Sequence, residues 1–336
     1  MQPFQPFDKS YASWAKLLLV FHLWAAVVES IDPITPKGGH SPQVTSHSFE
    51  KPPNSPCHYS SIGFETPWST DHMIELSKSF ARNPSTKMYT PAGNAQEHGC
   101  LLHLSTQNGA EMWGAVERGS FLGMDPHYCG LSRVPMRLTE KKWDDSSNAA
   151  AFVGTTVMEE SDNDSGDDDA VMMPMTLEFD CPYSFFANDL VEMPQECTVQ
   201  LAAFAHEIAV FDRLEDYKKH CQEVKARGDM AFADRSFFWT AIFHDDEEEE
   251  DSDKRPPRSN AIMTGHVVQS EVKLNEQTGE YFYWALVETV GGRLDVVIHP
   301  HLIDRHGESP PRVGCILQGH FWLSGRLVDL HEKFCK

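Results

Sequence analysis

The sequence predicts a mainly β protein of the α+β class, with an OB-like meander β-barrel in its C-terminal part and a few helices. Three observations predict this fold. Hydrophobic residues make up 40% and aromatic residues 11% of the 336 residues, which is enough for a packed core. Residues 261–330 contain β-branched and aromatic runs separated by glycine-rich turns. The strongest charge is confined to two short runs, so the rest of the chain has the balance of an ordinary folded protein.

The first 31 residues are predicted to form an apolar helix. Leu17 to Val28 is an apolar run preceded by two lysines and followed by small residues, the outline of a signal peptide. The run is shorter than the roughly 20 residues that a membrane span needs. An ordinary buried or partner-binding helix is the alternative, and we expect membrane contact only if residues 12–28 are an anchor. A cytoplasmic or nuclear protein is therefore favoured, with secretion or membrane anchoring as the alternative.

Residues 32–98 are predicted to be a largely disordered linker, because closely spaced prolines and many serines exclude a long helix or a central strand. A short helix is expected at 70–81, capped by Thr70 or Asp71. Ordered structure is expected to begin near Gly99.

Residues 99–158 are predicted to be a small β-rich segment, with strands at 101–104 and 112–116 between turn glycines. No Gly-rich phosphate loop or dinucleotide fingerprint is present there, and we expect no cofactor.

Two acidic runs are predicted to be linkers, at 159–174 and 244–260. The formal net charge is −22, and 15 of the 50 acidic residues lie in these runs. Like-charge repulsion keeps such segments solvated, as plain loops or as docking segments for a basic partner. A surface of this sign repels phosphate groups, so we expect no nucleic-acid partner.

Residues 175–243 are predicted to be a mixed α/β segment that packs on the barrel. Residues 175–179 and 198–211 fit strands, and Asp212 to Glu215 has the form of a capping box that begins a helix over 213–227. One continuous helix is the alternative, because the apolar residues of 201–211 also fit a helical stripe.

Residues 261–330 are predicted to form the OB-like barrel. Three antiparallel strands follow one another, a proline-containing connector comes next, and a glycine-interrupted strand returns. Their expected ranges are 261–274, 280–290, 293–299 and 314–328. The standard barrel has five strands, so we expect an upstream strand to complete the sheet.

The last strand has two distinguishable faces, because successive residues of a strand point to opposite sides. Its core face is predicted to carry Cys315, Leu317, Phe321, Leu323 and Leu327. The opposite face is rich in hydrogen-bond donors around one aromatic ring, as expected of a surface that binds a planar group beside an anion. Its candidate ligand residues are His320, Trp322, Ser324 and Arg326, with Arg293, Asp295 and His299 from the neighbouring strand. The alternative is that Trp322 packs under another part of the chain and Arg326 pairs with a surface carboxylate.

Metal and nucleophile motifs are weak. His299, His301 and His306 could approach a zinc ion if their loop folded back, but 17 histidines make chance clustering expected, and we predict no metal site. None of the eight cysteines forms a C-x-x-C pair, so free thiols are expected. No G-x-S-x-G elbow marks a nucleophile.

These observations favour a non-catalytic binding or assembly module whose partner is a protein or a small molecule. The alternative is an accessory enzyme of specialised metabolism, such as an isomerase, cyclase or hydrolase, that uses acid–base groups in a β-lined pocket. An open pocket holding His320, Arg326 and a carboxylate would favour the enzyme. A face covered by other parts of the chain would favour the module.

Overall fold

The computed structural model describes residues 57–67, 69–90, 99–117, 120–144, 149–157, 174–183, 191–240, 259–306 and 309–330. The predictions for the N-terminal apolar helix and for the two acidic runs fall outside these residues. No helix in the described part of the chain is long and apolar enough to cross a bilayer.

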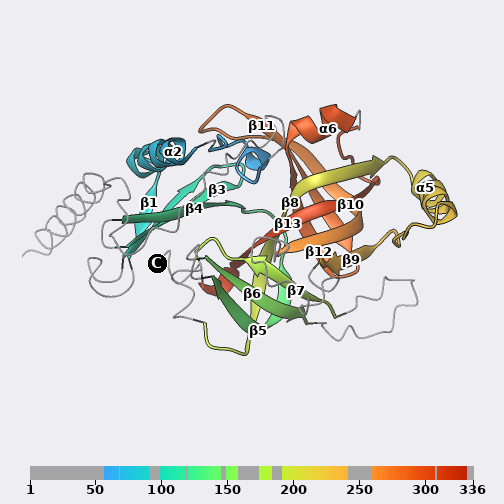
Figure 1. Cartoon of the computed structure of the whole chain (residues 1–336), viewed down its shortest axis with the longest axis horizontal. Helices are drawn as coiled ribbons and strands as arrows, with labels where there is room; N and C mark the ends of the chain where they lie inside the picture. Colours follow the sequence, from blue (N-terminus) through green and yellow to red (C-terminus); the bar gives the residue numbers. More distant parts are fainter. Residues whose placement is uncertain are drawn as a thin grey trace, which may run out of the picture.

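Within this part, strands dominate and form a four-stranded and a nine-stranded sheet, so the mainly β prediction is confirmed. The smaller sheet contains β1 (Lys87–Tyr89), β2 (Cys100–Ser105), β3 (Ala110–Glu117) and β4 (Ser120–Tyr128), in that spatial order. All its pairings are antiparallel, as expected of strands joined by short turns. Figure 1 shows this sheet with helix α2 (Thr70–Arg82) beside it.

The larger sheet contains the remaining strands. They are β5 (Val134–Asp144), β6 (Ala149–Thr156), β7 (Thr176–Asp180), β8 (Gln195–Phe211), β9 (Ser236–Trp239), β10 (Asn260–Leu274), β11 (Tyr281–Thr289), β12 (Gly292–Ile298) and β13 (Ile316–Leu327). The helical elements besides α2 are η1 (Ser60–Ile62), α5 (Leu214–Ala226) and α6 (Pro300–His306).

Five of these strands are joined in a cycle, which we call the first strand cycle. β10 pairs with β11, β11 with β12, β12 with β8, β8 with β13, and β13 again with β10. Only the β12–β8 pairing is parallel. The four C-terminal strands lie within one or two residues of their predicted ranges, and the upstream strand expected to join them is β8.

A second strand cycle shares β8 and β13 with the first. β8 pairs with β5, β5 with β6, β6 with β7, and β7 makes a single parallel pairing with β13. The 17 residues of β8 are long enough to serve both cycles, its first half beside β5 and its middle beside β12. Figure 1 shows β5, β6 and β7 as a group apart from β10, β11 and β12, with β8 and β13 connecting the two.

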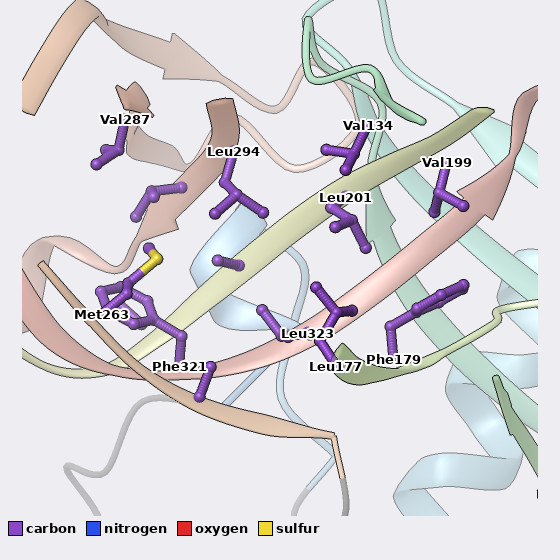
Figure 2. Packing of buried hydrophobic residues seen from close by; sticks show 14 of the residues in the cluster. Val134, Leu177, Phe179, Val199, Leu201, Met263, Val287, Leu294, Phe321 and Leu323 are labelled. Carbon is purple, nitrogen blue, oxygen red and sulfur yellow. The ribbon is translucent and has the colours of Figure 1, made fainter. Parts of the chain in front are cut away.

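One hydrophobic core continues through both cycles. Figure 2 shows Leu201 and Leu323, from the shared strands, pointing into the same space as Leu177 and Phe179 of β7. At the other end, Phe321 lies near Met263 of β10. The predicted core face of the last strand is confirmed: all five of its residues belong to this core.

Two further hydrophobic clusters lie outside this core. One packs η1 and the ends of β3 and β4 against the outer faces of β8, β11 and β13, through residues such as Ile62, Phe204 and Trp322. The other packs α2 against the far face of the four-stranded sheet. Burial on both faces explains why β8 has no polar alternation, and why its apolar run also matched a helical stripe in the sequence.

Several local expectations need correction. The sequence predicts residues 57–90 to be largely disordered apart from a helix at 70–81; that helix is confirmed as α2, but the segment also contains η1 and β1. The N-cap of α2 is Ser69, whose side chain accepts a hydrogen bond from the backbone of His72 at 3.1 Å, and not Thr70 or Asp71. Helix α5 follows β8 as predicted, but its N-cap is Arg213. The predicted N-cap, Asp212, instead accepts a hydrogen bond from the side chain of Arg312.

Candidate functional site

Most of the predicted ligand face on β13 is buried. The exposed fractions are 8% for Trp322, 1% for Ser324 and 7% for Arg326, whereas His320 is exposed. These side chains do share one face, as the alternation predicted. That face is covered by η1 and the four-stranded sheet, so it is not an open surface.

Trp322 is held by contacts on its ring and on its nitrogen. Its Nε1 donates to Oδ2 of Asp180 at 2.5 Å, and Ser259 donates to Oδ1 of the same carboxylate at 2.7 Å. Burial raises the pKa of Asp180, although these two hydrogen bonds oppose the effect. The ring of His58 stacks on Trp322 with a centroid distance of 3.9 Å, and His58 Nε2 lies 2.8 Å from Nε2 of His206. Trp322 therefore holds the segment before η1 against β13.

Arg326 is part of a buried charged cluster. Its Nη1 donates to Oε1 of Glu111 at 3.2 Å, and its Nη2 donates to Sγ of Cys129 at 2.9 Å. Trp113 Nε1 donates to Oε2 of Glu111 at 3.1 Å, and Nε2 of His103 lies 3.4 Å from Oε1 of Glu111. Burial alone would raise the pKa of Glu111, but His103 and Arg326 lower it to about 2. Arg326 therefore pairs with a carboxylate, as the alternative interpretation expected, but this carboxylate is buried and not at the surface.

Ser324 begins a second chain of buried hydrogen bonds. Its Oγ lies 2.8 Å from Nδ1 of His127, and Nε2 of His127 lies 2.7 Å from Oε1 of Gln200. Since the amide oxygen accepts, Nε2 of His127 carries the hydrogen and the serine hydroxyl donates to Nδ1. Gln200 Nε2 in turn donates to Asp295 at 3.0 Å. None of these four residues is more than 1% exposed, so this serine and histidine cannot meet a substrate from solution.

Asp295 accepts further hydrogen bonds from the backbone of Leu131 and Ser132 and from Nε1 of Trp284, at 2.8 to 3.0 Å. Burial raises its pKa, and these bonds oppose the rise. The chain passes so close here that a Cβ on Gly130 would lie 2.2 Å from the Asp295 carboxylate. This aspartate is a structural anchor for the loop after β4.

The strand expected alongside β13, β12, is separated from it by β8, and its other two predicted residues lie elsewhere. Arg293 is exposed and pairs with Glu288 at 3.1 Å. His299 lies at the junction of β12 and α6, beside an open pocket of about 310 Å³. The residues lining this pocket come from the η1 segment, from the start of β11 and from α6: Ser60, Gly63, Phe64, Glu280, Tyr281, His299, Pro300, His301 and Asp304.

One wall of this pocket is the η1 segment, which sequence reasoning assigned to a linker. Asn275 Nδ2 donates to the carbonyl of Ile62 at 2.9 Å, and Thr278 Oγ1 donates to the carbonyl of Gly63 at 2.6 Å. Gly63 ends η1 with φ of +74°, a conformation that favours glycine. The Ser-Ile-Gly turn followed by Phe64 is a weak sequence signal for an ordered segment. The residues that hold it, Asn275 and Thr278, lie more than 200 residues away in the sequence.

The pocket contains several titratable side chains. The backbone N–H of His301 donates to Nδ1 of His299 at 3.1 Å, so neutral His299 carries its hydrogen on Nε2. Burial and then His301 lower the pKa of His299, while Glu280 and Asp304 oppose this. His299 is therefore neutral at pH 7. Within the described side chains, no ion pair reaches Glu280 or Asp304.

The weak metal candidates are only partly assembled. The rings of His299 and His301 are 6.3 Å apart between centroids. His306 lies at the end of α6, and its side chain is outside the described part of the structure. In that part no three histidine, cysteine or acidic side chains are grouped as metal ligands.

No family model, curated protein or solved structure matches this chain.

Proposed function

We propose that the protein is a non-catalytic binding or assembly module built on a circularly permuted OB-like barrel. The order of the first strand cycle supports the barrel: a three-strand meander is followed by α6 and a returning strand. β8, which precedes the meander in the chain, takes the place of the fifth strand between β12 and β13.

The burial of the Ser324–His127 pair carries the functional part of this proposal. A nucleophile and a base must both reach the substrate, and these side chains are 1% and 0% exposed. His320 and Arg293 are exposed but lie apart from the described pocket, whereas several accessible polar groups come together in the pocket beside α6. There the exposed Glu280, Tyr281 and Asp304 are suited to hold a ligand.

The enzyme alternative rests on the same pocket. It combines a neutral histidine, two carboxylates and a tyrosine, which are groups able to move protons. No described contact orients one of these carboxylates on His299 as a base would require, so binding is the simpler function.

One experiment separates the two functions. The full chain is incubated with a mixed panel of cationic, neutral and anionic metabolites and short peptides, and mass spectrometry measures both retention and chemical conversion. We expect at least one compound to be retained unconverted, to be lost with Tyr281→Ala, and to be kept by Val313→Ala, an exposed apolar control outside the pocket. Conversion that disappears with His299→Gln would establish the enzyme. Retention that ignores Tyr281→Ala would place the binding site elsewhere.

A further inference from the structure

The charge of the pocket beside α6 is one-sided. Its lining contains two carboxylates, on Glu280 and Asp304, and no lysine or arginine. The carboxylates come from separate elements, Glu280 from the residue before β11 and Asp304 from α6, and both are exposed. Both line the same pocket as His299, and both raise the pKa of that histidine. A positive group in that space would meet two negative charges and no described basic side chain of the lining.

The pocket is also aromatic. Its lining includes Tyr281, which is 47% exposed, and Phe64, which is partly buried. Ring faces attract ammonium and guanidinium groups in addition to burying their alkyl chains. The neutral state of His299 adds no positive charge that would repel such a group at pH 7.

The size of the pocket argues against a bare metal ion. About 310 Å³ is at the lower end of the volumes of small-molecule sites. A calcium ion needs six or more oxygen ligands at about 2.3 to 2.6 Å, and in the described residues no three candidate ligands converge. An alkyl chain ending in a cationic group matches the volume, the aromatic walls and the charge together.

We infer that this pocket binds an organic cation, an ammonium or guanidinium group on an alkyl chain. Its source is either a free amine or a lysine or arginine side chain of a partner. This inference rests on the proposed binding function and narrows its ligand class.

The test uses matched probes that differ in charge. N-acetyl-lysine methylamide is compared with its neutral counterpart N-acetyl-norleucine methylamide and with the anionic N-acetyl-glutamate methylamide, by calorimetry and by NMR titration of the full chain. We expect the lysine probe to bind at least tenfold more tightly than either counterpart, and to weaken several-fold between 20 and 300 mM salt. Cadaverine distinguishes the sources: tighter binding of cadaverine than of the blocked lysine indicates a free amine, and the reverse order indicates a partner side chain.

Charge-neutralising variants complete the test. Glu280→Gln and Asp304→Asn should each weaken the lysine probe several-fold, whereas Glu223→Gln, on the exposed surface of α5, should not. Equal binding of the norleucine probe, or no binding of either cationic probe at 10 mM, overturns the inference. If the glutamate or norleucine probe binds and Tyr281→Ala abolishes that binding, the pocket is a binding site but the inference that its ligand is a cation is wrong. If no compound of the wider panel is retained either, the proposed function falls with it.

Discussion

Replacing Arg326 by methionine tests how the four-stranded sheet is joined to β13. Methionine fills much of the same space but leaves the buried carboxylate of Glu111 without its arginine partner, so that His103 is its one remaining described ion-pair partner. Removing one member of a buried ion pair costs about 3 to 5 kcal/mol, because the remaining charge is neither solvated nor paired. We expect Arg326→Met to lower the free energy of unfolding by this amount, measured as a shifted urea midpoint with an unchanged slope.

The pKa of Glu111 reports the whole buried cluster, in which His103 contributes more than Arg326 to the lowering. Its displacement from 4.5 to about 2 corresponds to roughly 3 kcal/mol of stability. The folded-state pKa is the lower one, so this contribution is present above about pH 4.5 and is lost as the pH falls toward 2. Arg326→Met should therefore flatten the acid limb of the stability profile, since part of the cause of the lowered pKa is removed.

A double variant separates the charge from the packing. Glu111→Leu combined with Arg326→Met removes both charges and keeps an apolar volume, so it should recover most of the stability lost in Arg326→Met alone. Some loss should remain, because Nε1 of Trp113 loses its acceptor. A cost below 1 kcal/mol for Arg326→Met would refute the reasoning and mean that water reaches the pair.

Two further predictions concern other contacts. Trp322→Phe keeps an aromatic ring against His58 but removes the hydrogen bond to Asp180. We therefore expect the free energy of unfolding in urea to fall by about 1 to 3 kcal/mol. A change of less than about 0.5 kcal/mol would contradict a stabilising role of this hydrogen bond. The folded-state pKa of His299 lies below its ordinary value of 6.5, so protonation opposes folding and stability should fall as the pH drops below 6.5. His299→Gln should lose less stability than the unmodified protein between pH 7.5 and pH 5.0, as measured by urea unfolding at the two pH values. An equal loss of unfolding free energy in the two proteins would contradict this prediction.

The local pattern of the sequence was sufficient to predict the C-terminal strands. Glycine turns bound β11 and β12, and a period of two placed Phe321 and Leu323 in the core. The bulge between His320 and Phe321 did not reverse these faces, because the extra residue lies on β8. Strand alternation thus identified which side chains of β13 lie together.

Alternation could not reveal what covers each face. Arg326 is hydrogen-bonded to Glu111, which is 215 residues away in the sequence, and His127 is hydrogen-bonded to Ser324, 197 residues away. Such pairings depend on the packing of one layer on another, and one strand carries no information about the opposing layer. A donor-rich row with a central tryptophan has the same sequence pattern whether it binds a ligand or a second sheet of the same chain.

The buried polar row also has a consequence for the open pocket. Buried polar groups that are hydrogen-bonded tolerate few alternative placements, so we expect the contacts of β13 to fix how the covering segments sit on this strand. Trp322 holds His58, and two residues later the chain reaches Ser60, in the wall of the pocket. The shape of the pocket therefore depends on a tryptophan that does not line it. A Trp322 variant that weakens ligand binding would act by displacing this wall, and only changes at the lining residues themselves report on direct contact with the ligand.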